Sequence, residues 1–175
     1  VTTYDVNLEG KLHKLTTYNC SPGAGARHLV FHNHYKIAYL ICELNSTIEV
    51  LIYDGVGAFE KMQVISTLPE GFNDFNGTAA IRLSQDGKYL YASNRGHDSI
   101  VVYTILADGS LELLEFVPTN GKTPRDFILS PDQEFLIAVH QDSDNATVFK
   151  RNPKSGRLAE LSNDFHVPEA VCVTF

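Results

Sequence analysis

The sequence predicts an all-β fold, a β-propeller of four-stranded antiparallel blades, with about three and a half blades present. Three segments share one apolar pattern and begin with GARHLVF, GTAAIRL and KTPRDFI. Their matching positions Arg27, Ala79 and Arg125 are offset by 52 residues (27 to 79) and then by 46 (79 to 125). A repeat of roughly 40 to 50 residues in which short apolar stretches alternate with polar turns is typical of propeller blades.

The elements follow in chain order. The first 20 residues match only the two outer strands of a blade, with a turn at Glu9 and Gly10. Three whole blades are predicted over residues 25–68, 77–118 and 123–163. In the second of these, the expected strands are 79–83, 89–94, 100–106 and 111–117, and Asp108-Gly109 is a hairpin-turn signal. Residues 167–175 are interpreted as a lone strand that closes a ring, and no helix is predicted.

This set of strands does not make a closed ring. Closed propellers typically carry four to eight blades, and closure removes the exposed sheet edges that promote aggregation. Two explanations are open. The chain is either the C-terminal half of a longer protein whose N-terminal blades are missing here, which we favour, or one of two copies that self-associate to complete the circle.

Composition excludes several classes of function. The chain has 14 basic and 21 acidic residues, a net charge of −7, and no basic stripe, so nucleic-acid binding is not expected. Apolar runs such as IAYLIC are far shorter than the roughly 20 residues that cross a bilayer, and the N-terminus lacks a signal pattern. Three cysteines without a CxxC pair argue against a disulfide framework and a zinc site, so we expect a cytoplasmic protein without metal or cofactor.

The repeat also predicts where side chains meet. In an antiparallel hairpin, the start of the first strand lies beside the end of the second, so residues sixteen apart here should share one rim. The innermost strands line the channel of a propeller, so three such pairs should converge there: Arg27 with Glu43, Ala79 with Arg95, and Arg125 with Gln141. Three of these six residues are arginines. An arginine-rich channel mouth on an acidic protein suits an anionic ligand.

Several stretches resemble the lactonase family of seven-bladed propellers, typified by bacterial 6-phosphogluconolactonase. They include GARHLVF, CELNST, SNRGHDSI, GKTPRDFILSPD, HQDSDNATVFKRNPKSGRL and the ending VPEAVCVTF, and cover most of the chain from Gly25 onward. The most specific feature is SNRGHDSI followed by TPRDF at this interval. The resemblance implies that the chain is the C-terminal half of a seven-bladed ring.

The resemblance further implies hydrolysis of 6-phosphogluconolactone to 6-phosphogluconate, in glucose metabolism and the pentose phosphate pathway, with a small anionic sugar lactone as the partner. The family's catalytic set maps to Arg27, Glu43 and Arg95, and a histidine from an earlier blade is also implicated. Two alternatives stay open: a lactonising isomerase of the muconate type, known from a related fungal branch, and a non-catalytic propeller that binds a partner through its rim.

Lactone hydrolysis needs a base to activate water and positive charge where the oxyanion develops. Either Glu43 or His28 could be the base. Arg95 and Arg125 are candidates for contacts with the oxyanion and the phosphate, since guanidinium offers paired donors. His28, Arg125 and Gln141 form the expected substrate-binding set.

Each candidate residue could instead have a purely structural role. Arg27 and Glu43 could form an ion pair that only stabilises the first hairpin. Arg125 could instead form a local salt bridge with Asp126, its neighbour. Strand alternation predicts that His28 points to the face opposite Arg27 and serves as a packing residue. His97 lies in an outer turn, where a structural role is expected.

Overall fold

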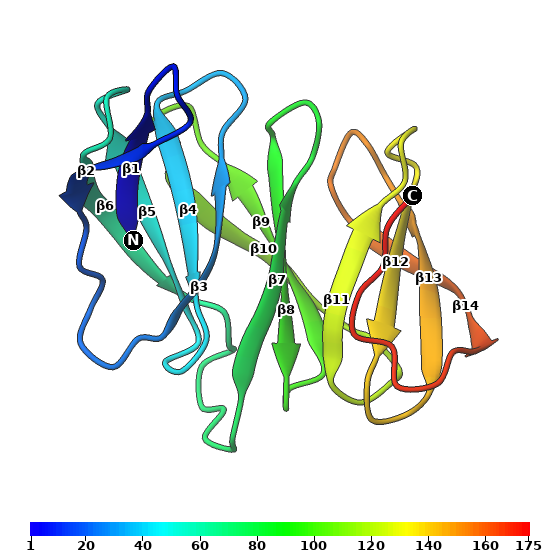
Figure 1. Cartoon of the computed structure of the whole chain (residues 1–175). Helices are drawn as coiled ribbons and strands as arrows, with labels where there is room; N and C mark the ends of the chain where they lie inside the picture. Colours follow the sequence, from blue (N-terminus) through cyan, green and yellow to red (C-terminus); the bar gives the residue numbers. More distant parts are fainter.

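The computed structural model describes all 175 residues and is all-β, which confirms the predicted fold class. Fourteen strands form one two-stranded and three four-stranded antiparallel sheets that stand side by side as blades (Figure 1). The two-stranded sheet consists of β1 (Thr2–Val6) and β2 (Leu12–Thr17). The structure has no helix long and apolar enough to cross a membrane.

Each four-stranded blade is a meander in which consecutive strands pair. The first blade contains β3 (Ala26–Phe31), β4 (Ile37–Cys42), β5 (Thr47–Tyr53) and β6 (Phe59–Ser66). The second contains β7 (Gly77–Leu83), β8 (Tyr89–Arg95), β9 (Ser99–Ile105) and β10 (Leu111–Pro118). The third contains β11 (Pro124–Leu129), β12 (Phe135–His140), β13 (Asn145–Arg151) and β14 (Leu158–His166). The first strands of the blades come together, because β7 contacts both β3 and β11.

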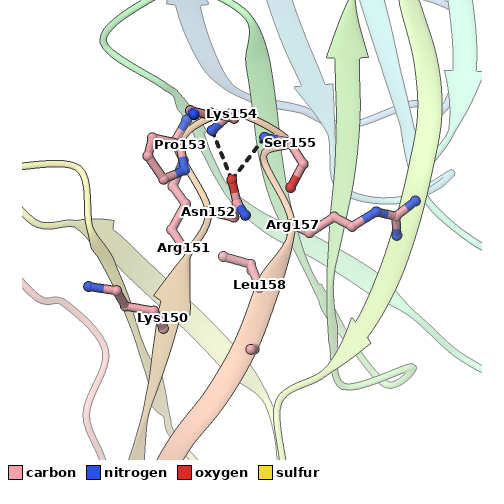
Figure 2. A pocket seen from close by; sticks show the side chains of 9 residues that line it. Lys150, Arg151, Asn152, Pro153, Lys154, Ser155, Arg157 and Leu158 are labelled. Atoms are coloured by element: carbon pink, nitrogen blue, oxygen red, sulfur yellow. Dashed lines mark hydrogen bonds between the residues drawn. The ribbon is translucent and has the colours of Figure 1, made fainter.

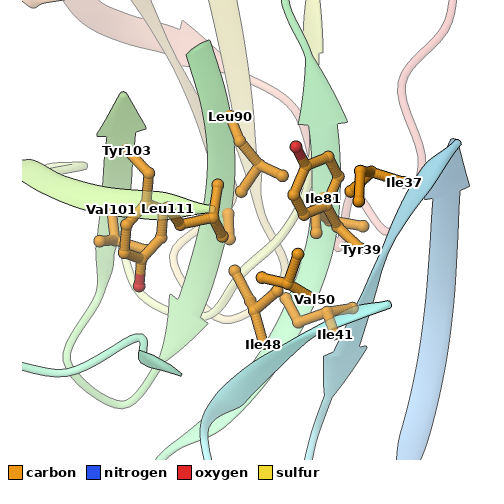
Figure 3. Packing of buried hydrophobic residues seen from close by; sticks show 11 residues of the cluster. Ile37, Tyr39, Ile41, Ile48, Val50, Ile81, Leu90, Val101, Tyr103 and Leu111 are labelled. Atoms are coloured by element: carbon orange, nitrogen blue, oxygen red, sulfur yellow. The ribbon is translucent and has the colours of Figure 1, made fainter. Parts of the chain in front are cut away.

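Face-to-face packing between blades explains why the central strands are apolar on both sides. All six residues of β4 are buried, although a strand exposed on one face would alternate. Ile41 and Ile48 of the first blade belong to one cluster with Leu90 and Tyr103 of the second (Figure 3). A separate cluster of ten buried residues joins the second blade to the third. Each Leu or Ile side chain buried in this way contributes about 1.5–3 kcal/mol.

Residues 167–175 do not form a strand within this chain. The segment lies against the third blade instead: Ala170 packs on Val139 and Ala146, and the Val173 N–H donates to Asp126 Oδ2 over 3.1 Å. A strand requires a hydrogen-bonded neighbour, and no edge in this chain pairs with these residues. The ring-closing role of the segment stays a prediction.

A buried arginine links the second and third blades. Arg151, at the end of β13, is 2% exposed and lies next to the turn that Asn152 organises through hydrogen bonds from the backbone N–H groups of Lys154 and Ser155 (Figure 2). The Arg151 Nε donates to the Tyr91 hydroxyl over 2.7 Å. That hydroxyl in turn donates to the carbonyl of Gly156 over 2.8 Å.

Removing the Tyr91 hydroxyl is expected to leave this buried charge without one acceptor. Tyr91→Phe should therefore lower the free energy of unfolding by about 1.5–3 kcal/mol, the range for hydrogen bonds to charged groups. Tyr39→Phe is the matched control, because the Tyr39 hydroxyl donates only to the neutral Gly109 carbonyl. It should lose about 0.5–1.5 kcal/mol. Urea unfolding measures both, and equal losses would contradict the role of Arg151.

Candidate active site

The first strand of each blade is irregular at the repeated position. Arg27 is the extra, unpaired residue of a β-bulge in β3, and Arg125 is the extra residue in β11. In β7 the register shifts over the matching Ala79 and Ala80. A bulge bends its strand and re-aims side chains, and bulges are over-represented beside active sites. Arg27 and Arg125 thus leave the regular alternation of their strands.

Glu43 lies between two arginines from different blades. Its Oε2 is 3.5 Å from the Nε of Arg27, so these residues face each other as the repeat predicts. Its Oε1 accepts a hydrogen bond from Nη2 of Arg95 in the second blade. Arg95 is held further by the backbone carbonyls of Gly77, at 3.3 Å, and Thr78, at 3.2 Å. Glu43 follows directly after β4, so the end of that strand places the carboxylate between the blades.

The guanidinium of Arg27 also connects the first blade to the second. Its Nη1 donates to the carbonyl of Ala79 and lies 3.2 Å from both ring nitrogens of His28. Partial burial lowers the pKa of Arg27, and the charge of Arg95 lowers it further, while Glu43 opposes the shift.

The prediction that His28 points away from Arg27 is wrong. Simple alternation holds only for a regular strand, and the bulge at Arg27 brings the two side chains together. Partial burial lowers the pKa of His28 below its usual value, and the positive charges of Arg27 and Arg82 add to the effect. The surroundings of His28 therefore favour its neutral ring, which can accept a hydrogen bond from Arg27.

Arg125 is paired as the repeat predicts, since its Nη1 donates to Oε1 of Gln141 over 2.9 Å. The alternative of a local Arg125–Asp126 salt bridge is wrong. Asp126 instead pairs with Arg82 of the second blade at 2.9 Å. Asp126 is thus engaged by another blade, and the bond to Gln141 is the only hydrogen bond that the Arg125 guanidinium makes within the chain.

A cleft of about 430 Å³ lies where the three blades meet. Four of the predicted residues line it, namely Glu43, Arg95, Arg125 and Gln141. Arg27 and His28 are not part of the lining, but Arg27 contacts a lining residue through its ion pair with Glu43.

Four more residues complete the lining, and the sequence did not single them out as site residues: Phe75, Gly96, Thr123 and Asp142. Phe75 lies in the connection 67–76, which is longer than the matching connection 119–123. The larger first offset of the repeat was the only signal for that loop. Chemically, the cleft combines one carboxylate, able to accept a proton, with two guanidinium groups, able to hold an anion.

His97 makes packing and polar contacts in and beside the second blade, which favour the structural role expected for it. Its Nδ1 lies 2.6 Å from the Ser99 hydroxyl, and its ring is in edge contact with Phe72 and Phe116. Burial lowers its pKa.

His140 is fully buried beside Gln141. Its Nδ1 lies 3.0 Å from the carbonyl of Asn145, so Nδ1 carries the proton and donates, while Nε2 has no partner. Burial lowers the pKa of this histidine, because a second proton would place an unpaired charge in the interior.

This burial makes folding stability depend on pH. At pH values above the unfolded pKa, near 6.5, both states hold neutral His140 and the residue has no effect. Below it, the unfolded chain binds a proton at His140 that the folded chain does not bind. The free energy of unfolding therefore decreases as the pH is lowered, by up to about 1.4 kcal/mol per pH unit. Urea unfolding between about pH 7 and about pH 5 should show a weaker dependence in His140→Asn, since the second blade has Asn94 at the matching position. An unchanged dependence would contradict this prediction.

The fold and the cleft define a β-propeller segment with an arginine-rich site at its inner strand ends. The sequence matches, over residues 1–175, the family described as Lactonase, 7-bladed beta-propeller. The chain belongs to this lactonase family.

Individual relatives agree with this membership. The chain is 39% identical over 169 residues to the 6-phosphogluconolactonase of Bacillus subtilis, covering 95% of this chain and 48% of that protein. A crystal structure of a Lactobacillus plantarum protein superposes with a TM-score of 0.95 at 42% identity, covering 98% of this chain and 50% of that one. The periplasmic gluconolactonase of Pseudomonas aeruginosa gives a TM-score of 0.87 at 32% identity, over 95% and 48% of the two chains. The chain spans about half the length of the curated relatives it matches.

Proposed function

We propose that this chain is part of an enzyme that hydrolyses 6-phosphogluconolactone to 6-phosphogluconate. The observation that carries the proposal is the placement of the Glu43 carboxylate and two arginines in one cleft. The name of the Bacillus relative supports a phosphorylated substrate, and that of the Pseudomonas neighbour supports a lactone without phosphate. An experiment therefore has to test whether the substrate carries a phosphate group.

In the proposed mechanism, Glu43 is the general base. Its Oε2 is 3.5 Å from Arg27, longer than a normal hydrogen bond, so this oxygen keeps a lone pair for a water molecule. Glu43 takes a proton from that water as the oxygen bonds to the lactone carbonyl carbon. The bond from this carbon to the ring oxygen then breaks, and the ring oxygen receives the proton. Glu43 is preferred to His28 because only Glu43 lines the cleft.

The two arginines of the cleft bind different groups of the substrate. Arg95 lies beside Glu43 and would donate to the carbonyl oxygen as it gains charge in the transition state. Arg125 lies on the third blade, where Gln141 orients it, and would bind the phosphate.

Arg125→Ala is expected to raise the KM for 6-phosphogluconolactone by about 10- to 100-fold, since one charge-assisted contact is worth about 1.5–3 kcal/mol. The KM for gluconolactone, which has no phosphate, should change little. Initial rates corrected for spontaneous ring opening measure both values. An equal increase for both substrates would contradict the assignment of Arg125 to the phosphate.

Completion of the ring is part of the proposal. The third blade presents a hollow of about 420 Å³ lined only by apolar side chains, among them Ile137, Val148 and Phe165. At the other end, Val6 and Leu12 of the two-stranded sheet are exposed. Both faces suit packing against further blades, supplied either by an N-terminal half or by a second copy.

The test is lactone hydrolysis by this chain and by the ring completed with its missing blades, with the oligomeric mass measured on the same samples. Turnover of 6-phosphogluconolactone by the completed ring supports the proposal. A folded, complete ring without turnover would overturn it and leave the isomerase or the binding propeller. The cytoplasmic location stays a prediction.

A further inference from the structure

Phe75 is an exposed aromatic residue at the lip of the cleft. Its side chain is 87% exposed, and it is the only hydrophobic residue among those lining the cleft. A single exposed apolar side chain is ordinary on a protein surface. Phe75 differs because the fold holds its position from several sides.

The loop that carries Phe75 is anchored at both ends to one polar network. At its start, the N–H and the hydroxyl of Thr67 both donate to the carbonyl of Ser46, over 2.9 and 3.0 Å. At its end, the Asn76 amide donates to the Ser46 hydroxyl over 2.9 Å and to Asn94 Oδ1 over 3.2 Å. Thr67 and Asn76 are both buried, so both ends of the 67–76 connection are fixed to the blades.

Two contacts hold the middle of the loop against the second blade. The ring of Phe72 packs edge-on against His97 with 5.0 Å between the centroids. Gly96, with a φ of +129°, lets the backbone of Phe75 approach closely, because a Cβ atom there would lie 2.1 Å from the Phe75 carbonyl oxygen. The backbone of Phe75 is thus held beside Gly96 at the cleft, so mainly the side chain remains to be ordered when a ligand covers it.

We infer that Phe75 is a specificity-determining residue that packs against the substrate's ring; the inference rests on the proposed lactone hydrolysis. A sugar lactone has polar edges and an apolar face of C–H groups. Glu43, Arg95 and Arg125 offer partners only for the polar edges and the phosphate, while the flat ring of Phe75 matches the apolar face. Inorganic phosphate has no such face and gains nothing from Phe75.

The test uses Phe75→Ala in the complete ring, with 6-phosphogluconolactone as substrate and inorganic phosphate as a competing anion. We expect the KM for the lactone to rise about tenfold and the inhibition constant of phosphate to stay unchanged. Phe75→Tyr should restore the wild-type KM, and Phe75→Leu, which lacks the flat ring, should restore it only in part. Leu8→Ala, at an exposed position in the β1–β2 turn, is the control.

Three outcomes would overturn the inference. An unchanged KM in Phe75→Ala beside normal wild-type turnover would overturn the role of Phe75 alone. An equal weakening of lactone and phosphate would show that the substitution displaced the arginines. Absence of wild-type turnover would overturn the proposed function and the inference with it.

Discussion

Glu43→Gln is expected to lower kcat/KM for 6-phosphogluconolactone by about 10²- to 10⁴-fold, the usual contribution of a general base. Glutamine keeps the shape of the side chain but accepts no proton at neutral pH. It also removes the negative charge between Arg27 and Arg95, whose guanidinium groups both approach Glu43. Initial rates on the complete ring measure the loss, and thermal unfolding of the same variant shows that the fold survives.

This substitution also separates catalysis from the competing structural role of the Arg27–Glu43 pair. If the pair only stabilises the hairpin, the variant keeps its turnover and loses part of its thermal stability. Glu112→Gln, at an exposed position of β10, is the matched control and should change neither property. Wild-type turnover in Glu43→Gln would remove Glu43 from the catalytic assignment and leave His28 as the candidate base.

Arg95→Lys is expected to lower kcat by about 10²- to 10³-fold, the range seen when one oxyanion donor is removed. The guanidinium of Arg95 bonds Glu43 and the carbonyls of Gly77 and Thr78 simultaneously. Lysine keeps the charge but carries it on one nitrogen, so it cannot satisfy these partners and also donate to the substrate. The substrate's KM should change less than kcat, because the contact strengthens in the transition state.

Arg157→Lys is the control, because it makes the same arginine-to-lysine exchange outside the cleft. Arg157, just before β14, pairs with Glu115 of β10 at 2.6 Å, and neither residue lines the cleft. This change should leave kcat and KM unaltered. Full activity in Arg95→Lys would show that positive charge alone is sufficient and that paired donors at this position do not stabilise the oxyanion.

The blades were predictable from the sequence because their signals are local. Alternating apolar residues, turn pairs such as Asp108-Gly109 and the repeat offsets define each meander without knowledge of its neighbours. In the second blade, every strand begins and ends within two residues of its predicted range. The spacing of sixteen also predicted that Arg27 faces Glu43 and that Arg125 meets Gln141, since both contacts lie within one hairpin.

Contacts between blades were decided by the tertiary structure. The sequence predicted that Arg95 and Glu43 converge, but their direct bond depends on how two separate sheets are placed. The pairing of Asp126 with Arg82, rather than with its neighbour Arg125, depends on the same placement. The bulge that turns Arg27 toward His28, and the anchored loop that presents Phe75, have no periodic signal. Hydrophobic periodicity records which face of a strand is buried, whereas a cleft between blades depends on register and inter-sheet geometry, which only the packed fold specifies.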